Sequence, residues 1–345
     1  MPAPLSIVWL APPLAPGQGG IRNILRMAGY LARFGHTVRV HVDPCDFGDA
    51  AALGAFVARH YGPSPLVYRC GHRDIGACDA VVATFWTTAP SAAAHREARG
   101  RFYFVQDYEP AFYPPDSAEH RAAAATYRLG LHHLCSGPWC AKVLRERFSA
   151  RAEHFAFPLD RRVYFERLRA FYRPHVVFFA RPEMPRRRFP LGVAALAEVY
   201  RHTPGLVVSL FGSASLPPGS VPFPHRDLGI VPTLERLSRL YANADVGLAF
   251  SATNPSLVPL EMMASGCPVV EIDNEITRQS YASGSVRLAA DAPAAVAEAV
   301  LALLGDPFER ARQRAAGLEF AATFPDEEGA ARQVEAALLR GLRDA

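Results

Sequence analysis

Residues 246–270 read VGLAFSATNPSLVPLEMMASGCPVV. An apolar run over Val246–Phe250 is followed by a proline-bounded loop, a helical stretch near Leu260–Ala264, a glycine turn and a second apolar run over Pro268–Glu271. Short continuous apolar runs on either side of a helix are typical of parallel strands that are buried on both faces. This stretch therefore predicts one strand–helix–strand unit of a parallel sheet.

The same alternation of apolar runs and helical stretches extends along the chain in two sets. The first set of predicted strands comprises Leu5–Leu10, Val38–Val42, Val81–Thr84, Phe102–Val105 and His154–Phe157, with helices over Gly20–Phe34, Ala89–Arg99 and Ser117–Leu129. The second set adds strands over Val176–Phe179 and Leu206–Leu210, with helices over Pro190–His202 and Thr233–Ala242. Two such sets predict an α/β protein with two doubly wound domains, because right-handed crossovers leave few other topologies.

A charged segment over Arg161–Pro174 marks the expected boundary between the two domains. We therefore expect a first domain over residues 1–165 and a second over residues 172–320. Helical patterns continue afterwards over Pro293–Leu304, Pro307–Ala316 and Asp326–Leu342. The last of them, within residues 321–345, is expected to pack back onto the first domain.

Composition excludes several classes of protein and of site. The net charge of +4 is too mild to indicate a nucleic-acid binder. No apolar run approaches the roughly 18 residues of a membrane span, and no basic stretch precedes Leu5–Leu10, so we expect a cytoplasmic protein without a signal peptide. The six cysteines form no CxxC pair, and the spacing of His132, His133, Cys135 and Cys140 fits no structural zinc site. We expect buried thiols and no metal.

A glycine-rich turn, Gly17-Gln18-Gly19-Gly20, follows the first predicted strand and leads into a helix. Backbone N–H groups at Gly19 and Gly20 could meet a phosphate, since a helix N-terminus carries partial positive charge. The turn matches neither the dinucleotide fingerprint nor the P-loop. A plain tight turn would have the same residues.

An arginine-rich loop follows the strand predicted over Val176–Phe179. It contains Arg181, Arg186, Arg187 and Arg188, at the strand end where a doubly wound sheet binds its ligand. A charge-assisted contact to phosphate contributes roughly 1.5–3 kcal/mol, so two or three would hold a diphosphate. The alternative is a solvated basic loop.

The loop and helix after Phe250 form the third candidate site. Glu261 falls near a predicted helix start, where its carboxylate could accept hydrogen bonds from a ribose diol. Ser256 and Leu257 lie at the helix N-terminus, whose N–H groups could face phosphate. The alternative is that Glu261 only caps the first helical turn.

Together these segments resemble glycosyltransferase family 4, and within it the rhamnosyltransferases related to WsaF. The resemblance covers nearly the whole chain and rests on several motifs. They are Gly19-Gly20 with Leu31–Val38, Ser136, Phe157–Asp160 with Phe165, Arg181 with Arg186–Arg188, Leu228–Val231, Leu240-Tyr241, Ala244–Val246, and Pro259–Glu261 with Pro268–Val270. The segment Gln106–Pro114 indicates the rhamnosyltransferase-like branch.

The resemblance implies a GT-B fold, in which two Rossmann-like domains face each other across a cleft. It also implies transfer of a sugar, with rhamnose a candidate, from a nucleotide diphosphate donor to a glycan acceptor. The donor is expected to be a dTDP sugar ahead of UDP or GDP, with Ile230 and Val231 at the base and no metal or other cofactor.

Two departures from the family pattern affect the reacting end. Thr253 stands where the family has the first of two glutamates, and Gln106 stands where many members have a histidine. A side chain that assists the acceptor hydroxyl must then come from the first domain, where Asp107 is the first candidate and Glu109 the second. A catalytically idle binding relative and a sugar-nucleotide epimerase of the same architecture remain alternatives.

A lipid-linked acceptor would bring the first domain to the inner face of the membrane. Basic side chains together with aromatic ones motivate this expectation. They are Arg121, Arg128, Lys142, Arg145, Arg147, Phe112 and Tyr113.

Overall fold

The computed structural model describes residues 3–170 and 173–344. Within these ranges the chain forms two compact units: unit 1 comprises residues 3–157 and 327–344, and unit 2 lies within residues 158–326. The division precedes the expected boundary at residue 165. Leu159 N donates to Pro325 O at 2.9 Å, and Arg161 Nη2 donates to Ala322 O at 2.6 Å. These bonds tie the segment after Phe157 to unit 2.

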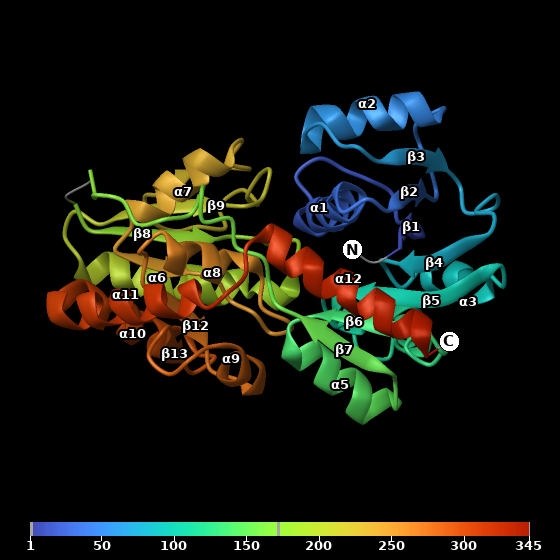
Figure 1. The fold of residues 1–345 in the computed structure, drawn as a ribbon. Coiled ribbons are helices and arrows are strands. Elements are labelled where there is room, and N and C mark those ends of the chain that lie inside the picture. The colour runs from blue at the N-terminus through green and yellow to red at the C-terminus, as the bar shows by residue number, and fades with distance from the viewer. Residues whose placement is uncertain (1–2, 171–172, 345) are drawn as a thin grey trace. The chain divides into compact units, whose positions relative to one another are not determined.

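A parallel sheet forms the centre of unit 1 (Figure 1). Within the described residues its seven strands have the order β3-β2-β1-β4-β5-β6-β7. The strands are β1 (Ser6–Ala11), β2 (Thr37–Val42), β3 (Val67–Cys70), β4 (Cys78–Ala83), β5 (Ala98–Val105), β6 (His132–Ser136) and β7 (Ala152–Phe155). The direction of winding reverses between β1 and β4, so ligands are expected beyond the carboxyl ends of these two strands.

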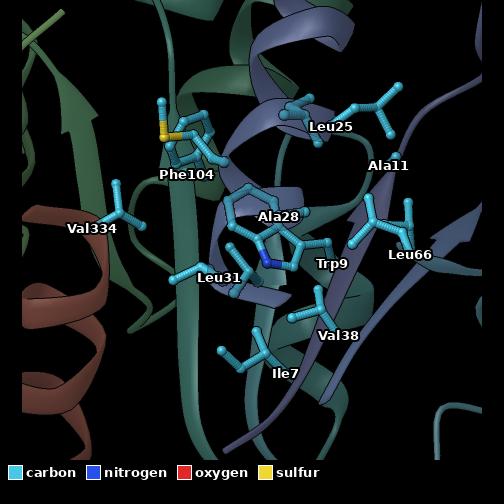
Figure 2. Close-up of a cluster of buried hydrophobic side chains, with 14 of the residues drawn as sticks. Ile7, Trp9, Ala11, Leu25, Ala28, Leu31, Val38, Leu66, Phe104 and Val334 are labelled. Carbon is cyan, nitrogen blue, oxygen red and sulfur yellow. The ribbon is translucent and has the colours of Figure 1, made fainter. Parts of the chain in front are cut away.

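Helices cover both faces of this sheet. Neighbouring residues of β1 such as Trp9 and Leu10, which point to opposite faces, are therefore both fully buried. The helices are α1 (Gly19–Arg33), α2 (Ala50–Tyr61), α3 (Ala89–Ala94), α4 (Ala118–Thr126), α5 (Pro138–Phe148) and α12 (Glu327–Arg343), with the 3₁₀ helix η1 (Glu109–Phe112). Figure 2 shows Trp9 among Leu25, Leu31 and Phe104, with Val334 of α12 nearby. The last helix of the chain thus completes the core of unit 1.

Unit 2 repeats this architecture with a parallel sheet of order β10-β9-β8-β11-β12-β13 over its described residues. The strands are β8 (His175–Phe179), β9 (Val207–Phe211), β10 (Arg226–Asp227), β11 (Val246–Leu248), β12 (Val269–Ile272) and β13 (Arg287–Ala289). The helices are α6 (Phe189–His202), α7 (Leu234–Ala242), α8 (Leu257–Ala264), α9 (Glu275–Ser280), α10 (Pro293–Gly305) and α11 (Pro307–Ala322), with the 3₁₀ helix η2 (Pro185–Arg187). Its winding reverses between β8 and β11.

The structure differs from the expectations in several places. The helix predicted over Ala89–Arg99 ends at Ala94, because β5 begins at Ala98 and pairs with β4. Cys45 and Cys70 form a disulfide instead of the expected thiols, whereas Cys78, Cys135, Cys140 and Cys267 are buried free cysteines. No helix in the described ranges combines the length and apolar character that a bilayer crossing needs.

Candidate functional site

The loops after β8 and β11 flank the switch point of unit 2. They carry the arginine-rich segment that follows Phe179 and the segment that leads from Phe250 to Ser256. Two motifs separated by some 70 residues in the sequence thus belong to neighbouring strands of one sheet. Their position is where a doubly wound sheet binds its ligand.

Helix α8 begins at Leu257, three residues before the predicted start, and Ser256 is its N-cap residue. The Ser256 side chain caps no helical N–H group, and its buried Oγ has no hydrogen-bond partner among the described residues. The first N–H groups of a helix have no partner within it, and together with the helix dipole they favour an anion. This end of α8 can therefore receive a phosphate.

Glu261 lies one turn inside α8 and is half-buried. The first turn contains no acidic residue, so the alternative that Glu261 caps it is wrong. Burial, with the charge of Glu261 second, holds the pKa of Tyr241 well above its usual range. The half-buried carboxylate of Glu261 remains a suitable acceptor for hydrogen bonds from the hydroxyl groups of a ribose.

Arg181 lies at the carboxyl end of β8 and forms an ion pair with Glu183. Its guanidinium is 5.7 Å from the centre of the Phe179 ring, and Ser213 Oγ donates to Glu183 Oε2 at 3.2 Å. Burial acts to raise the pKa of Glu183, but hydrogen bonds from its own amide and from Arg181 outweigh it and lower the pKa. Arg181 is thus placed and oriented at the switch point.

Arg187 faces the interior and holds the loop after β11. It is 7% exposed, and its Nη1 donates to Ser251 Oγ at 2.8 Å and to Phe250 O at 3.4 Å. Glu271, fully buried at the end of β12, accepts Ser251 N at 2.8 Å. Burial raises the pKa of Glu271 to about 8. Arg187 and Glu271 therefore both hold the loop after β11 in place at Ser251.

The remaining arginines depart from the expected diphosphate clamp. Arg188 forms an ion pair with Asp291, and the backbone carbonyl of Arg186 accepts Ala252 N at 3.0 Å. With Arg187 turned inward, the arginines of this segment differ in what they contact within unit 2. The sequence signals charge but cannot distinguish these roles, because each depends on a partner distant in the chain.

The residues predicted at the base follow the edge strand β10. Gly212 N donates to Gly229 O at 2.8 Å, which ties this loop to the end of β9. Ile230 is 51% exposed, and Val231 lines a cavity of about 530 Å³ together with Leu228. Exposed apolar side chains at this edge could pack against the face of a base.

In unit 1, the glycine turn is joined to the end of β5. Gln106 Nε2 donates to Gly20 O at 3.2 Å, and Gln106 Oε1 accepts Asn23 Nδ2 at 3.0 Å. A Cβ atom at Gly20 would come within 3.4 Å of Gln106 Nε2, whereas one at Gly19 would meet open space. Both positions therefore have room for a Cβ atom, and the N-terminus of α1 at Gly19 and Gly20 is exposed.

The two predicted catalytic carboxylates have different environments. Asp107 is 7% exposed and its Oδ1 accepts the next amide, Tyr108 N, at 2.8 Å, as an aspartate that fixes a turn would. Glu109 is 2% exposed, and its Oε2 accepts Trp86 N at 2.6 Å and Tyr103 Oη at 2.7 Å. Burial raises the pKa of Glu109 to about 8. Glu109 therefore joins loops and does not fit the expected role of a base at the substrate.

No cluster of three or more metal-ligating side chains occurs in the described ranges. The Asp273-Asn274-Glu275 segment, which resembles a metal-binding motif, begins α9. Asn274 caps that helix, and both carboxylate oxygens of Asp273 accept from Arg278, at 2.6 and 2.8 Å. Arg278 therefore pairs with the carboxylate of Asp273 within the same segment.

Several of the side chains expected at a membrane have partners within unit 1. Arg128 lies 4.7 Å from the centre of the Phe148 ring and donates to Arg147 O at 3.3 Å, while Arg145 donates to Ala152 O at 3.0 Å. The two aromatic residues of that prediction, Phe112 and Tyr113, are half-buried and pack within unit 1.

Comparison with known proteins agrees with this architecture. Residues 174–301 match the family model described as the C-terminal domain of WsaF. The O-antigen biosynthesis protein RfbC of Myxococcus xanthus is 33% identical in an alignment of 298 positions that covers 82% of this chain, and the chain spans 23% of the length of RfbC.

Solved structures agree over almost the full chain. Anabaena Alr3699/HepE in complex with UDP-glucose superimposes with a TM-score of 0.74 at 15% identity, covering 97% of this chain and 100% of that one. WaaG, a glycosyltransferase involved in lipopolysaccharide biosynthesis, gives 0.65 at 15% identity, covering 96% and 99%. The chain therefore has the two-domain α/β GT-B fold.

Proposed function

We propose that the chain is a glycosyltransferase of O-antigen or related glycan assembly, which transfers a sugar from a nucleoside diphosphate donor to a glycan acceptor. The observation that carries the proposal is the unit 2 switch point. There Arg181 and the N-terminus of α8, where the side chain of the N-cap residue Ser256 caps no N–H group, follow neighbouring strands of the sheet within the segment that matches the WsaF C-terminal domain. The relation to RfbC supports glycan assembly as the setting.

Transfer breaks the bond between the anomeric carbon and the diphosphate oxygen and forms one to an acceptor hydroxyl oxygen. Negative charge grows on the leaving diphosphate, and a guanidinium and helix N–H groups stabilise such charge. In this proposal Arg181 and the N-terminus of α8 at Ser256 serve the diphosphate, and Glu261 serves the ribose. The acceptor proton passes to Asp107 of unit 1, since Thr253 provides no carboxylate.

The donor in this proposal is a pyrimidine nucleotide sugar, with rhamnose as the transferred sugar. Resemblance to the WsaF-like branch favours dTDP, and the complexes of Alr3699/HepE contain UDP-glucose or UDP. Both bases are pyrimidines, which Ile230 and Val231 would cover. The transfer is proposed to proceed without a metal.

A thermal-shift panel with dTDP, UDP, GDP and NAD tests the donor site, because a ligand that binds the folded state raises its stability. We expect dTDP or UDP to raise the melting temperature and NAD to leave it unchanged. Arg181→Gln should weaken the shift. Arg312→Gln removes an arginine of unit 2 whose side chain is 77% exposed, and it should keep the shift. A shift only with NAD would refute the proposal.

Turnover separates transfer from the two alternatives. A solved structure of the same fold is described as a putative UDP-N-acetylglucosamine 2-epimerase from Listeria monocytogenes, with a TM-score of 0.64 at 9% identity. The fold alone therefore does not distinguish sugar transfer from epimerisation. An idle relative would bind the nucleotide without turnover, and an epimerase would act without a glycan acceptor.

A further inference from the structure

We propose that Phe85, Trp86, Phe112 and Tyr113 form an aromatic platform in unit 1 that binds a pyranose ring of the acceptor glycan. This inference rests on the proposed transferase function and names the part of unit 1 that recognises the acceptor.

The platform lies at the switch point of unit 1. Phe85 and Trp86 follow the end of β4, which is one of the two strands between which the winding reverses. Phe112 and Tyr113 come from the end of η1, which follows the adjacent strand β5. Both pairs therefore lie at the carboxyl edge of the sheet, where ligands of doubly wound domains bind.

The four rings form two interlocked pairs. Phe85 and Phe112 stack with ring centres 6.4 Å apart and an angle of 20° between their planes. Trp86 and Tyr113 meet edge to face at 5.9 Å, and Trp86 Nε1 donates to Tyr113 Oη at 2.9 Å. All four side chains are half-buried, so each keeps part of its surface open to solvent.

Polar groups, of which Glu109 and Thr88 are buried, hold both loops of the platform in place. Glu109, which lies in η1, accepts a hydrogen bond from the backbone N–H of Trp86 at 2.6 Å. One carboxylate thus ties the two loops together. Thr88 Oγ1 accepts Phe85 N at 3.2 Å, and His120 Nδ1 lies 2.9 Å from Pro110 O. A surface fixed in this way loses little conformational freedom when it binds a ligand.

This combination matches the chemistry of a sugar ring. A pyranose presents a C–H face that is apolar and a rim of hydroxyl groups. Aromatic side chains that carry a polar group suit ligands with an apolar face and a polar, hydrated rim. In the platform, Phe85 and Phe112 provide apolar faces, and Trp86 and Tyr113 add polar atoms. Asp107, which follows the same strand β5, would then meet the acceptor near its hydroxyl group.

Tryptophan fluorescence tests the platform directly. Of the three tryptophans, all within the described ranges, Trp9 and Trp139 are 0% and 8% exposed and Trp86 is half-exposed. We expect at least one of methyl rhamnoside, methyl glucoside and methyl mannoside to change the emission saturably, and Trp86→Phe to abolish that change. No response to any glycoside up to its solubility limit, or a response that persists in Trp86→Phe, would overturn the proposal.

Kinetics provide a second readout on the full chain. Phe112→Leu and Trp86→Phe should raise the KM for a glycan acceptor by roughly 2- to 10-fold each and leave the donor KM unchanged. Equal changes in both KM values would indicate a general structural defect and overturn the assignment. The melting temperature of each variant shows whether it has folded.

Further comparisons distinguish the sugar-binding platform from the proposed transferase function and from membrane binding. A glycoside response without any dTDP or UDP shift would keep the platform and refute the transferase. Nucleotide shifts without a glycoside response and with unchanged acceptor KM would refute the platform alone. Anionic phosphatidylglycerol vesicles that change Trp86 emission, when no glycoside does, would assign these rings to a membrane and also overturn the proposal.

Discussion

Glu109 provides a prediction whose size follows from its environment. Its pKa is raised by burial from the ordinary 4.5 to about 8. One pKa unit corresponds to about 1.4 kcal/mol, so the ionised form costs the folded state up to ~5 kcal/mol relative to the unfolded chain. Because burial raises the pKa of Glu109 in the folded protein, the protonated side chain stabilises the fold relative to the ionised one. This stabilisation is full below pH 4.5 and is lost as the pH rises towards 8.

Glu109→Gln keeps an oxygen that can accept Trp86 N and Tyr103 Oη but removes the ionisation. We therefore expect the free energy of unfolding of the variant, minus that of the wild type, to rise between pH 4.5 and 8 and then level off. Urea denaturation of both proteins across this range measures the difference, in which other titrating groups cancel. A difference that is constant with pH would show that Glu109 does not titrate with a raised pKa in the folded protein.

Glu109→Ala is the matched variant, because it removes the acceptor altogether. It leaves the Trp86 N–H and the Tyr103 O–H unpaired in the interior, at about 1–3 kcal/mol each. We expect it to be less stable than Glu109→Gln at every pH. Equal stability of the two variants would mean that the carboxylate does not join the loops.

Four further predictions concern the proposed site. Asp107→Asn should lower kcat by roughly 10²–10⁴-fold and keep dTDP affinity and the melting temperature, and a wild-type rate would remove Asp107 from the mechanism. Glu261→Gln should raise the donor KM at least as much as it lowers kcat, and an unchanged donor KM would remove it from the ribose. Glu271→Gln should gain stability relative to wild type as the pH rises towards 8, because burial raises the pKa of Glu271 to about that value, whereas a flat difference would contradict its burial as an acid. EDTA should leave transfer unchanged, and loss of activity restored by magnesium would show a metal requirement.

Much of the fold could be predicted from the sequence because its main signal is local. Apolar runs such as Val176–Phe179 coincide with β8 almost to the residue, since a strand buried on both faces must be apolar throughout. The edge strand β10 gave no such signal. Arg226–Asp227 forms β10 with both residues exposed, and its strand character comes only from pairing with β9.

The site was predicted less completely because its roles depend on distant partners. Arg181 and Arg187 look alike in the sequence, yet one lies at the carboxyl end of β8 and the other is buried against Ser251. Glu109 looked like a base beside Asp107, but its partner Trp86 N lies 23 residues earlier in the chain. Local pattern indicates which residues are charged, whereas pairing across the sheet decides what they touch.

The most direct measurement of the central claim is the stoichiometry of one reaction. The protein is incubated with dTDP-rhamnose or a UDP sugar and a glycan acceptor, and the products are quantified by mass spectrometry. We expect equal amounts of free nucleoside diphosphate and of acceptor that is heavier by one sugar residue. Nucleoside diphosphate released without any glycosylated acceptor, or no turnover of either donor despite tight nucleotide binding, would contradict this expectation.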